Sequence, residues 1–431
     1  MPGTFTYTFN TPAFKGASTI RTGLFIGGKW VDPVDPAMID VINPATGKVI
    51  TAVSAGSFKD VDIAVDVAKK AYKTSWGLKV PGTMRGKLLY KIADLLERDL
   101  SEFAALESKI YANAKGEIQS SVDVFRYYAG WADKVQGKTI ETNENKLAYT
   151  RHEPYGVVGQ VIPWNAPLLM VAWEFGPALA TGNTIVIKPS EITPLTALRF
   201  ADLVNEAGFP PGVVNIVNGY GPTVGQAITV HPLIEKVAFT GSISVGRKIL
   251  KASSESNLKV VTLELGGKSP TIIFDDADIE QAIECAASGI FSNMGQACIA
   301  GSRIFVQEGI YDKFLAKFTA IAKNLADATG DPFVPGMQHG PQISQMQFDR
   351  VMSYIESGKQ DGATVHIGGA RHGKEGYFIQ PTIFTNTKPD MKIVREEIFG
   401  PVGVVTKFKT EDGASILLFD TMAKVDKVFK R

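Results

Sequence analysis

Residues 236–267 read KVAFTGSISVGRKILKASSESNLKVVTLELGG, and this stretch decides the fold class. A short apolar run, Lys236–Thr240, is followed by a turn, a helical segment at Val245–Ser253 and a second apolar run, Lys259–Leu265. Short apolar runs separated by a helix are typical of strands that are buried on both faces of a parallel sheet. The stretch therefore predicts a strand–helix–strand unit with its turn at Gly241–Gly246.

The same alternation continues on both sides of this unit. Before it, the pattern predicts strands at Gly156–Pro163, Thr184–Lys188 and Val213–Val217, and helices at Pro167–Ala180, Thr193–Ala207 and Thr223–Val230. After Gly267, it predicts strands at Thr271–Phe274, Arg303–Val306 and Ala363–Ile367, and helices at Ile279–Phe291, Gly309–Asp327 and Gln345–Gln360. Two such series predict an α/β fold of two units that meet near residue 267.

The pattern before residue 155 is mixed. Residues 1–60 read as strands and turns, and Leu147–Glu153 alternates like an isolated strand. Apolar spacing predicts helices at Asp60–Trp76, Thr83–Ser108 and Asp123–Gly137.

Size and charge exclude several classes of partner. The chain has 431 residues, which corresponds to roughly two to three domains of typical size. It carries 45 Lys and Arg against 44 Asp and Glu, so no basic excess marks a nucleic-acid or anionic-membrane footprint. The most apolar window, Val161–Ala180, is interrupted by prolines and by Glu174 and fails as a membrane span. We therefore expect neither nucleic acid nor membrane as a partner.

The N-terminus and the cysteine count predict a cytoplasmic protein. The N-terminus has no apolar core of a secretory signal. Residues 1–31 contain three cations and no acids, which resembles a transit peptide faintly, so a mitochondrial location is the alternative. Two cysteines make no disulfide scaffold and fit a reducing compartment. The five histidines lack metal-ligand spacing, so no metal site is expected.

The two cysteines differ in their surroundings. Cys285 falls within the apolar helical stretch Ile279–Phe291 and is expected to be a buried structural residue. Cys298 follows the segment 293–297, NMGQA, whose small, polar and turn-forming residues favour an exposed thiol near N–H donors that stabilise a thiolate. The alternative for Cys298 is also a small inert hydrophobe.

Two polar residues stand next to apolar strands. Glu264 lies between two leucines, where burial would raise its carboxyl pKa toward the range of a general base; the alternative is a strand-end carboxylate in water. Asn165 offers either an amide N–H to an oxyanion or a cap to the helix that follows.

Two glycine-rich turns predict phosphate contacts. Gly219–Gly225 follows a predicted strand. The alternative is that its glycines only allow a tight turn between strand and helix, as in many α/β folds that bind no phosphate there. Gly241–Gly246 joins a strand to a helix, where free N–H groups and the helix dipole favour a phosphate. This turn differs from the usual G-x-G-x-x-G fingerprint, and Gly267-Lys268-Ser269 is no P-loop tail, because Thr262 stands where the loop needs its first glycine.

Lys188 and Glu191 follow the predicted strand Thr184–Lys188. Ligands of parallel sheets bind at this edge, where a carboxylate accepts from ribose hydroxyls and repels a 2′-phosphate. The alternative is a pair of solvated charges at a strand end.

Six stretches together resemble the aldehyde dehydrogenase superfamily, in its NAD-dependent non-acylating branch. They are GQVIPWN at 159–165, VIKPSE at 186–191, FTGS at 239–242, LELGGKSP at 263–270, GQAC at 295–298 and EEIFGP at 396–401. The resemblance runs from about Gly23 to Asp412. It implies a Rossmann-like NAD-binding domain at 23–135 and 155–266, an oligomerisation strand segment at 136–154 and an incomplete catalytic domain at 267–412, between an N-terminal extension, 1–22, and a tail, 413–431.

The resemblance also implies catalytic roles. Cys298 would attack an aldehyde to give a thiohemiacetal, whose oxyanion Asn165 and the backbone N–H of Cys298 would hold. Collapse would send a hydride to NAD and leave a thioester, which water activated by Glu264 would hydrolyse. Esterase turnover by the same thiol is a further possibility. Met170 and Trp173 would line the aldehyde tunnel.

The implied NAD site draws on both units. Lys188 and Glu191 would hold the adenosine ribose, Ser242 and the turn Gly241–Gly246 the pyrophosphate, and Glu397 the nicotinamide ribose beside Phe399. Further residues assigned to the cofactor are Ile162, Pro163, Trp164, Gly221, Gly225, Phe239, Leu265 and Gln347. Glu191 favours NAD over NADP.

Two features depart from the family pattern. Ala166 stands where relatives of this branch often carry an aromatic residue, so we expect a wider tunnel that admits bulkier aldehydes. Residues 413–431 do not resemble the family, although Ser415–Arg431 has an amphipathic helical pattern. The resemblance implies a homotetramer whose last strand pairs with Lys138–Glu153, and the lack of that strand predicts weakened assembly. An alternative function is a catalytically impaired relative that binds NAD or acts as an interaction subunit.

Overall fold

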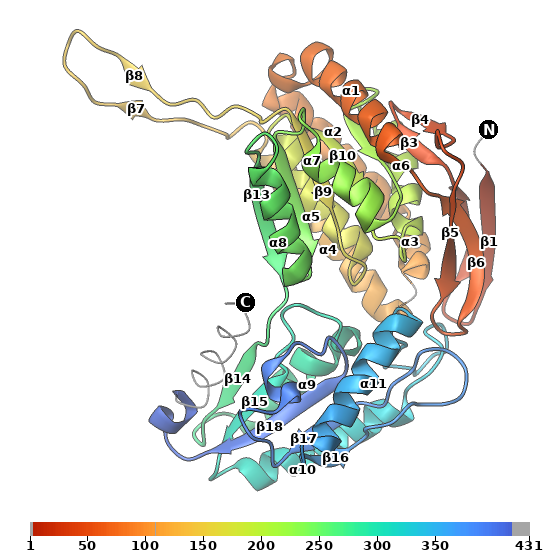
Figure 1. The fold of residues 1–431 in the computed structure, drawn as a ribbon, viewed down its shortest axis with the longest axis vertical. Helices are drawn as coiled ribbons and strands as arrows, with labels where there is room; N and C mark the ends of the chain where they lie inside the picture. The colour runs from red at the N-terminus through yellow and green to blue at the C-terminus, as the bar shows by residue number, and fades with distance from the viewer. Residues whose placement is uncertain (1–2, 108, 416–431) are drawn as a thin grey trace.

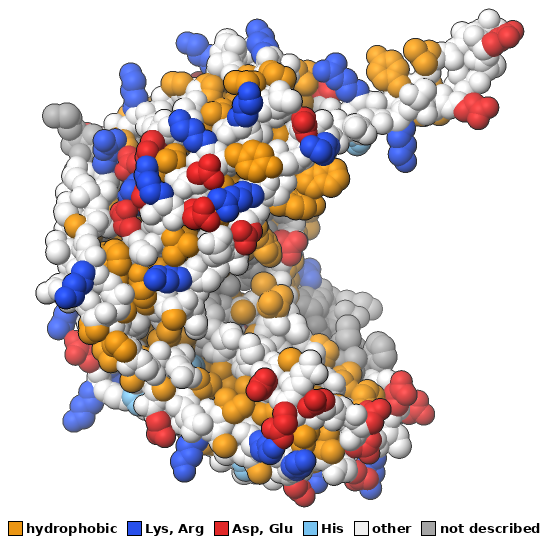
Figure 2. Space-filling model, turned by 180° about the vertical axis from the view of Figure 1, so that it is seen from behind, with side chains coloured by type: hydrophobic (Ala, Val, Ile, Leu, Met, Phe, Trp, Pro, Cys, Tyr) orange, Lys and Arg blue, Asp and Glu red, His pale blue; other side chains and the backbone are white. Residues whose placement is uncertain are grey.

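Two α/β units, each built around its own sheet, make up the computed structural model, which describes residues 3–107 and 109–415. Figure 1 shows the elements up to β13 stacked above those from β14 onward. The space-filling view in Figure 2 shows the molecule hollowed on one side between them. The α/β fold class expected from the sequence is confirmed.

The first unit contains a seven-stranded sheet in the order β13-β12-β9-β10-β11-β3-β4. The strands from β13 to β11 are parallel, and β3 and β4 are added antiparallel at one edge. The strands are β3 (Leu24–Ile26), β4 (Lys29–Val31), β9 (Val157–Val161), β10 (Thr184–Lys188), β11 (Val214–Ile216), β12 (Lys236–Gly241) and β13 (Val260–Leu265).

Helices bury both faces of this sheet. Ile185 and Ile187 of β10 are fully buried on one face and Val186 on the other, because successive strand side chains alternate. One face carries α5 (Pro167–Ala180) and α6 (Leu195–Ala207), with α2 (Gly82–Arg98), α3 (Leu100–Leu106) and α4 (Tyr111–Trp131) packed on them. The other face carries α1 (Phe58–Thr74), α7 (Gln226–Val230) and α8 (Ile243–Ser254).

The second unit contains a five-stranded sheet in the order β14-β15-β18-β17-β16, parallel except for β16. Its strands are β14 (Pro270–Ile273), β15 (Arg303–Gln307), β16 (Thr364–Ile367), β17 (Thr382–Thr385) and β18 (Val402–Phe408). One core joins this sheet to α9 (Ile279–Phe291) and α10 (Tyr311–Asp327). A second core joins it to α11 (Gln345–Gln360) and α12 (Lys392–Arg395).

Three separate two-stranded hairpins complete the described part of the chain. β1 (Thr4–Asn10) pairs with β2 (Lys15–Arg21), and β5 (Met38–Asn43) pairs with β6 (Lys48–Ser54). The third, β7 (Thr139–Ile140) with β8 (Ala148–Tyr149), projects away from the first unit in Figure 1.

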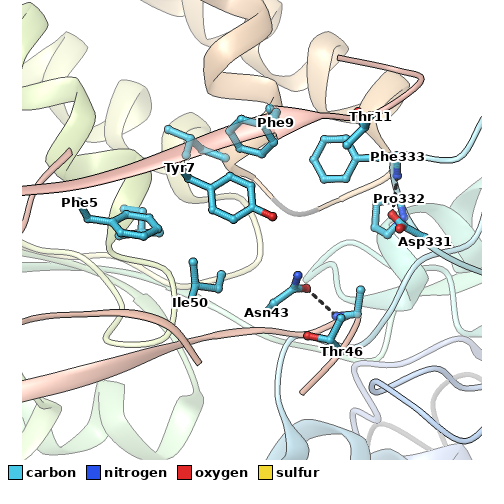
Figure 3. Close-up of a pocket in the computed structure, with 14 residues that line it drawn as sticks. Phe5, Tyr7, Phe9, Thr11, Asn43, Thr46, Ile50, Asp331, Pro332 and Phe333 are labelled. Carbon is cyan, nitrogen blue, oxygen red and sulfur yellow. Dashed lines mark hydrogen bonds between the residues drawn. The ribbon is translucent and has the colours of Figure 1, made fainter. Parts of the chain in front are cut away.

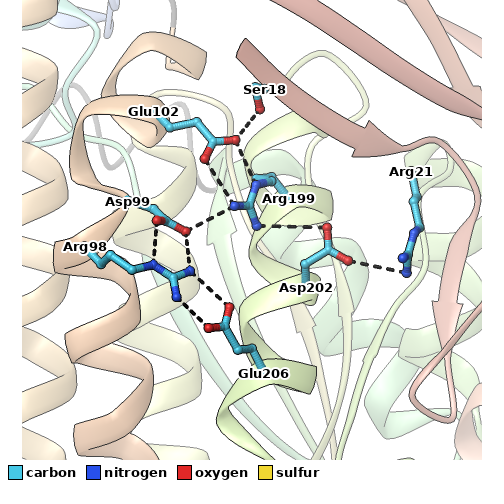
Figure 4. A network of polar contacts seen from close by, with 8 residues as sticks. All are labelled: Ser18, Arg21, Arg98, Asp99, Glu102, Arg199, Asp202 and Glu206. Carbon is cyan, nitrogen blue, oxygen red and sulfur yellow. Dashed lines mark hydrogen bonds and ion pairs between the residues drawn. The ribbon is translucent and has the colours of Figure 1, made fainter. Parts of the chain in front are cut away.

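A polar network holds the first of these hairpins to the helices (Figure 4). Arg199 of α6 pairs with Asp99 and Glu102, and Glu102 also accepts a hydrogen bond from Ser18 of β2. The further pairs are Arg21–Asp202, Arg199–Asp202, Arg98–Asp99 and Arg98–Glu206. The network therefore connects three segments that are distant in sequence: β2, the junction of α2 and α3, and α6.

The structure corrects several expected boundaries. The helix expected over Thr83–Ser108 is divided at Asp99, whose backbone leaves the helical conformation (φ −97°, ψ 13°) while its carboxylate pairs with two arginines. The helix expected from Asp123 to Gly137 is α4, which begins at Tyr111 and ends at Trp131. The strand expected at Leu147–Glu153 is reduced to the two residues of β8. The strands β17 and β18 were not predicted.

Two further expectations concern membranes and the tail. Within the described ranges, no helix is long and apolar enough to cross a bilayer. The amphipathic pattern at Ser415–Arg431 lies, from residue 416 onward, outside the described residues.

Candidate active site

The site begins at the point where the strand order of the first sheet reverses. β9 is followed along the chain by its neighbour β10, but its other neighbour, β12, comes later in the chain. Ligands of open parallel sheets bind at such a switch point, beyond the carboxyl ends of the strands. The segment Ile162–Asn165 follows β9 there, and Ser242 follows β12. The sequence placed these residues in a common site, and the sheet brings their strands side by side.

The loop before Cys298 has an unusual backbone. Asn293 and Met294 have positive φ angles of 49° and 56°, and Gly295 follows at 69°. A Cβ at Gly295 would lie 2.0 Å from the carbonyl oxygen of Gly400, so only glycine fits this close approach. Non-glycine residues in the left-handed region cost roughly 1–3 kcal/mol each and cluster at functional sites. Cys298 follows shortly after this turn, and its side chain is exposed as expected.

Asn165 bridges the two units next to this loop. Its Nδ2 atom donates to the carbonyl of Gln296 at 3.0 Å. Asn293 Nδ2 donates in return to the carbonyls of Asn165, at 3.0 Å, and of Gln296, at 3.1 Å. The side-chain amide of Asn165 therefore lies against the backbone two residues before Cys298. No cap from the Asn165 side chain to α5 is present, because the residue at the cap position is Ala166 and it makes no side-chain bond.

Glu264 is exposed, which corrects the expectation of a buried carboxylate. β13 is the edge strand of the sheet, and its residues alternate between exposed and half-buried. Because strand side chains alternate, Leu263 and Leu265 face α8 while Glu264 faces the other side. The flanking leucines therefore do not surround the carboxylate. Its free access to water is the alternative that the sequence had left open.

Cys285 is also exposed, although the sequence pattern predicted a buried residue. It lies on α9 between Glu284 and Ala286, on the outer side of an amphipathic helix whose buried positions are Ile283, Ala286, Ala287, Ile290 and Phe291.

Glu397 approaches the end of β13 from the second unit. Its Oε1 accepts from the backbone N–H of Gly267 at 3.2 Å, and a Cβ at Gly266 would lie within 2.5 Å of the carboxylate. Burial raises the pKa of the Glu397 carboxyl, while the Gly267 N–H, Arg350 and Lys268 oppose this change. Burial next to Arg303 lowers the pKa of Lys268 to about 7. The contact with Gly267 joins two of the quoted motifs in space.

Phe399 has a left-handed backbone, with φ 60°. Its carbonyl accepts from Gln347 Nε2 at 2.7 Å, and its ring meets Trp164 edge to face, with centroids 5.2 Å apart. These three residues were assigned to the cofactor from separate parts of the sequence, and Phe399 contacts both of the others. The remaining assigned positions differ in burial. Buried are Ile162, Gly225, Phe239 and Gly246, half-buried are Pro163, Gly241 and Leu265, and Gly221 is exposed.

Lys188 and Glu191 form a salt bridge of 2.9 Å at the end of β10, where Lys188 is the last residue of the strand. The Lys188 side chain is almost entirely buried, while Glu191 is one-third exposed. Burial lowers the pKa of Lys188, and the carboxylate of Glu191 opposes that shift. Lys188 and Glu191 therefore form a largely buried ion pair at the sheet edge, and they are not two separate solvated charges.

The residues at this edge fit a dinucleotide. Ser242 caps α8 by accepting from the N–H of Val245, and the first turn of this helix offers N–H groups to an anion. The Lys188–Glu191 pair and Glu397 supply donors and acceptors suited to two riboses. A Cβ at Gly221 or Gly267 would meet no atom within 4 Å, so ligand atoms have room beside both residues.

The expected substrate residues lie along α5. Ala166 and Met170 are half-buried, and Trp173 is 53% exposed. Trp173 lines an open pocket of about 530 Å³ together with Asp123, Val124, Tyr127 and Tyr128 of α4. These α4 residues were not predicted from the sequence, although the aromatic run 125–131, FRYYAGW, was a signal for them. Within residues 3–107 and 109–415, no cluster of His, Cys, Asp and Glu could hold a metal ion.

Comparisons with known proteins identify one family. The model of the "Aldehyde dehydrogenase family" matches residues 30–421, which passes Asp412, where we expected the resemblance to end. "Aldehyde dehydrogenase" of Agaricus bisporus is 60% identical over 97% of this chain and 84% of its own length. "Aldehyde dehydrogenase, cytosolic 1" of Macroscelides proboscideus is 51% identical over 91% of this chain and 79% of its own length. The solved NAD⁺ complex of the Bacillus cereus aldehyde dehydrogenase is 46% identical, with a TM-score of 0.90 over 92% of this chain and 81% of that chain.

Proposed function

Since this chain belongs to the aldehyde dehydrogenase family and is an NAD-dependent aldehyde dehydrogenase, we propose that it oxidises its aldehyde to a carboxylic acid through Cys298. The observation that carries the proposal is the hydrogen bond from Asn165 Nδ2 to the carbonyl of Gln296. This bond holds an amide donor of the first unit against the backbone of the second unit, two residues before the exposed thiol of Cys298. A nucleophile and an oxyanion donor in adjacent positions are the parts that acyl chemistry requires.

In the proposed reaction the Cys298 sulfur attacks the aldehyde carbon and forms a thiohemiacetal. The former carbonyl oxygen becomes an oxyanion, which the backbone N–H of Cys298 and the Asn165 amide stabilise. An amide nitrogen carries two hydrogens. One hydrogen of Asn165 Nδ2 is engaged with Gln296, so the other is available to the oxyanion.

NAD, when bound, supplies the hydride acceptor for the oxidation. We propose that Lys188 and Glu191 hold the adenosine ribose, that Ser242 and the first turn of α8 hold the pyrophosphate, and that Glu397 holds the nicotinamide ribose beside Phe399. The negative charge of Glu191 would repel a 2′-phosphate, which supports NAD over NADP. The other proposed contacts are Ile162, Pro163, Trp164, Gly221, Gly225, Phe239, Gly246, Leu265 and Gln347.

Glu264 would complete the cycle. Its carboxylate would accept a proton from the water that attacks the thioester, which releases the carboxylic acid and restores the Cys298 thiol. The exposure of Glu264 supports this role, because the hydrolytic water must reach both groups.

Three further assignments belong to the same proposal. Residues 23–135 and 155–266 bind the cofactor, and residues 267–412 supply the nucleophile. The segment 136–154 joins subunits of a homo-oligomer; Leu147 and Tyr149, which are 79% and 68% exposed on the projecting hairpin, support this role. A cytoplasmic location is in keeping with the name of the Macroscelides relative.

NADH formation from acetaldehyde and benzaldehyde by the purified chain tests the reaction, with Cys298→Ala as the control. We expect turnover in the native chain and none in the variant, while both still bind NAD in a titration. A native chain that binds NAD without turnover would instead support the impaired relative. Hydrolysis of an activated ester without NAD would show separately whether the thiol alone is reactive.

A further inference from the structure

A cavity of about 150 Å³ lies beneath the N-terminal hairpin, outside the candidate active site (Figure 3). β1 forms its roof, because Phe5, Tyr7 and Phe9 alternate along this strand and line the cavity from one face. Ile50 of β6 lies opposite, and Phe333 of the second unit closes one end. The cavity is therefore bounded by residues of both units.

The elements around this cavity are held in place. The β1–β2 hairpin is tied to α3 by the 2.6 Å hydrogen bond from Ser18 to Glu102, and the Phe9 and Phe333 rings lie 5.7 Å apart. The loop that carries Phe333 is fixed by the N–H of Tyr111, which donates to the carbonyl of Pro332 at 3.2 Å. Ligand sites are usually formed before the ligand binds, and this cavity meets that condition.

The lining indicates a small aromatic ligand. Most of the wall is aromatic or aliphatic, and an apolar cavity of about 150 Å³ is large enough to bind benzene. Aromatic rings also pack favourably edge to face or offset against other rings. Phe5, Phe9 and Phe333 offer such partners from three directions (Figure 3).

The polar groups at the cavity restrict the ligand further. The side-chain oxygen of Asn43 accepts from the N–H of Ala45, and that of Thr46 accepts from the N–H of Lys48. The hydroxyl of Tyr7 points into the cavity in Figure 3, and no hydrogen bond joins it to another described residue. Asp331 adds a carboxylate at the end near Phe333. A ligand can therefore form a hydrogen bond with the Tyr7 hydroxyl. A negatively charged ligand would be repelled by the Asp331 carboxylate.

We propose that this cavity is a second small-molecule site, which takes a neutral single-ring aromatic molecule with one hydroxyl or carbonyl substituent. The ring would lie among Phe5, Phe9 and Phe333, and the substituent would bond to the Tyr7 hydroxyl. Aromatic carboxylates would be disfavoured by Asp331. The site shares no residue with the proposed catalytic machinery. A ligand there would contact both units at once and would stabilise the folded chain.

Titration of the full chain with 4-fluorophenol, followed by ¹⁹F NMR, tests the proposal. We expect saturable binding to the native chain, about fivefold weaker binding to Tyr7→Phe through the loss of one hydrogen bond, and none to Ile50→Phe, which fills the cavity. Tyr149→Phe, an exposed tyrosine on the projecting hairpin, is the matched control and should bind as the native chain does. 4-Fluorobenzoate should bind at least tenfold more weakly than the phenol.

Several outcomes would overturn the second site. No saturable binding to the native chain would refute it directly. If Tyr7→Phe and Ile50→Phe both bind 4-fluorophenol with the affinity of the native chain, the ligand binds elsewhere. If only Trp173→Ala loses binding, the ligand binds in the α4–α5 pocket. Tyr7→Phe keeps the ring, so the test does not depend on Ile50→Phe folding. Equal affinity for phenol and benzoate would refute the assigned charge preference. Because NADH formation is not the readout, failure here is distinct from failure of the proposed function.

Discussion

The side chain of Asn165 donates a 3.0 Å hydrogen bond to the backbone carbonyl of Gln296, which is 131 residues away in the sequence. Asn165 follows β9 of the first sheet, and Gln296 ends the left-handed turn before Cys298. Asn293 donates to the carbonyls of both residues and closes the contact. The two units therefore meet through one polar cluster at the proposed nucleophile.

Replacing Asn165 by alanine should impair the chemical step. The variant loses an oxyanion donor, so we expect kcat to fall by about 10²- to 10³-fold. NAD affinity should stay unchanged, because the proposed cofactor contacts remain. Steady-state NADH formation and an NAD titration measure the two quantities. A kcat within threefold of the native value would contradict the proposed role.

Gly295→Ala should destabilise the fold. The new Cβ would lie 2.0 Å from the Gly400 carbonyl oxygen at a residue with φ 69°, so we expect a loss of about 3 kcal/mol or more in the free energy of unfolding. Gly289→Ala is the matched control, because a Cβ on this α9 residue meets no atom within 4 Å; it should stabilise by roughly 0.5–1 kcal/mol. Chemical denaturation compares the two variants. Equal effects would show that the contact with Gly400 is unimportant.

Ala166→Phe should narrow the proposed aldehyde path. Ala166 is half-buried at the start of α5, four residues before Met170. We expect the ratio of kcat/KM for benzaldehyde to that for acetaldehyde to fall about tenfold or more, since small steric differences in a pocket are worth about 1–3 kcal/mol. An unchanged ratio would mean that residue 166 does not determine the accepted size.

The stability of the fold should depend on pH through the raised pKa of the Glu174 carboxyl. Burial raises the pKa of its carboxyl to about 7, with Glu264 adding repulsion and Lys236 opposing it. Since the charged form is unfavourable only in the folded chain, stability is lost as the pH rises from the unfolded pKa of about 4.5 through 7. Glu174→Gln should therefore stabilise by on the order of 1–3 kcal/mol at pH 8 and by much less at pH 5.

Melting temperatures at pH 5 and pH 8 test whether Glu174→Gln stabilises more at the higher pH. Glu284→Gln, on the exposed side of α9, is the control. The control should shift the melting temperature little at either pH. A Glu174→Gln effect that is the same at pH 5 and pH 8 would be inconsistent with a raised pKa.

The network in Figure 4 offers a matched pair of arginines. Arg199 is 15% exposed and pairs with Asp99 and Glu102, so Arg199→Met leaves poorly solvated carboxylates and should cost about 3 kcal/mol. Arg98 is 49% exposed, and Arg98→Met should cost about 1 kcal/mol or less. Urea denaturation at low and moderate salt compares them. A larger cost for Arg98→Met than for Arg199→Met would contradict the greater contribution expected of the less exposed arginine.

Local patterns predicted many elements closely. Thr184–Lys188, Pro167–Ala180, Ile279–Phe291 and Gln345–Gln360 were expected with the bounds that the structure has. Their apolar spacing matches the strand or helix period, and proline, glycine or a cap marks their ends. The first half of α4 was missed, because polar residues at 115–120 dilute its pattern. β17 and β18 were missed as short buried runs without clear period.

The motifs along the chain were sufficient to identify the family and its NAD chemistry, because each motif is a short run of adjacent residues. Only the tertiary structure determined which of these side chains are exposed and which residues lie next to them. Glu264 is exposed because β13 lies at the sheet edge, and Cys285 because it faces outward from α9. Asn165 meets the Cys298 loop because β9 lies at the switch point and its end faces the second unit. Such contacts depend on which strands pair and which faces are covered, and local periodicity carries no information about either.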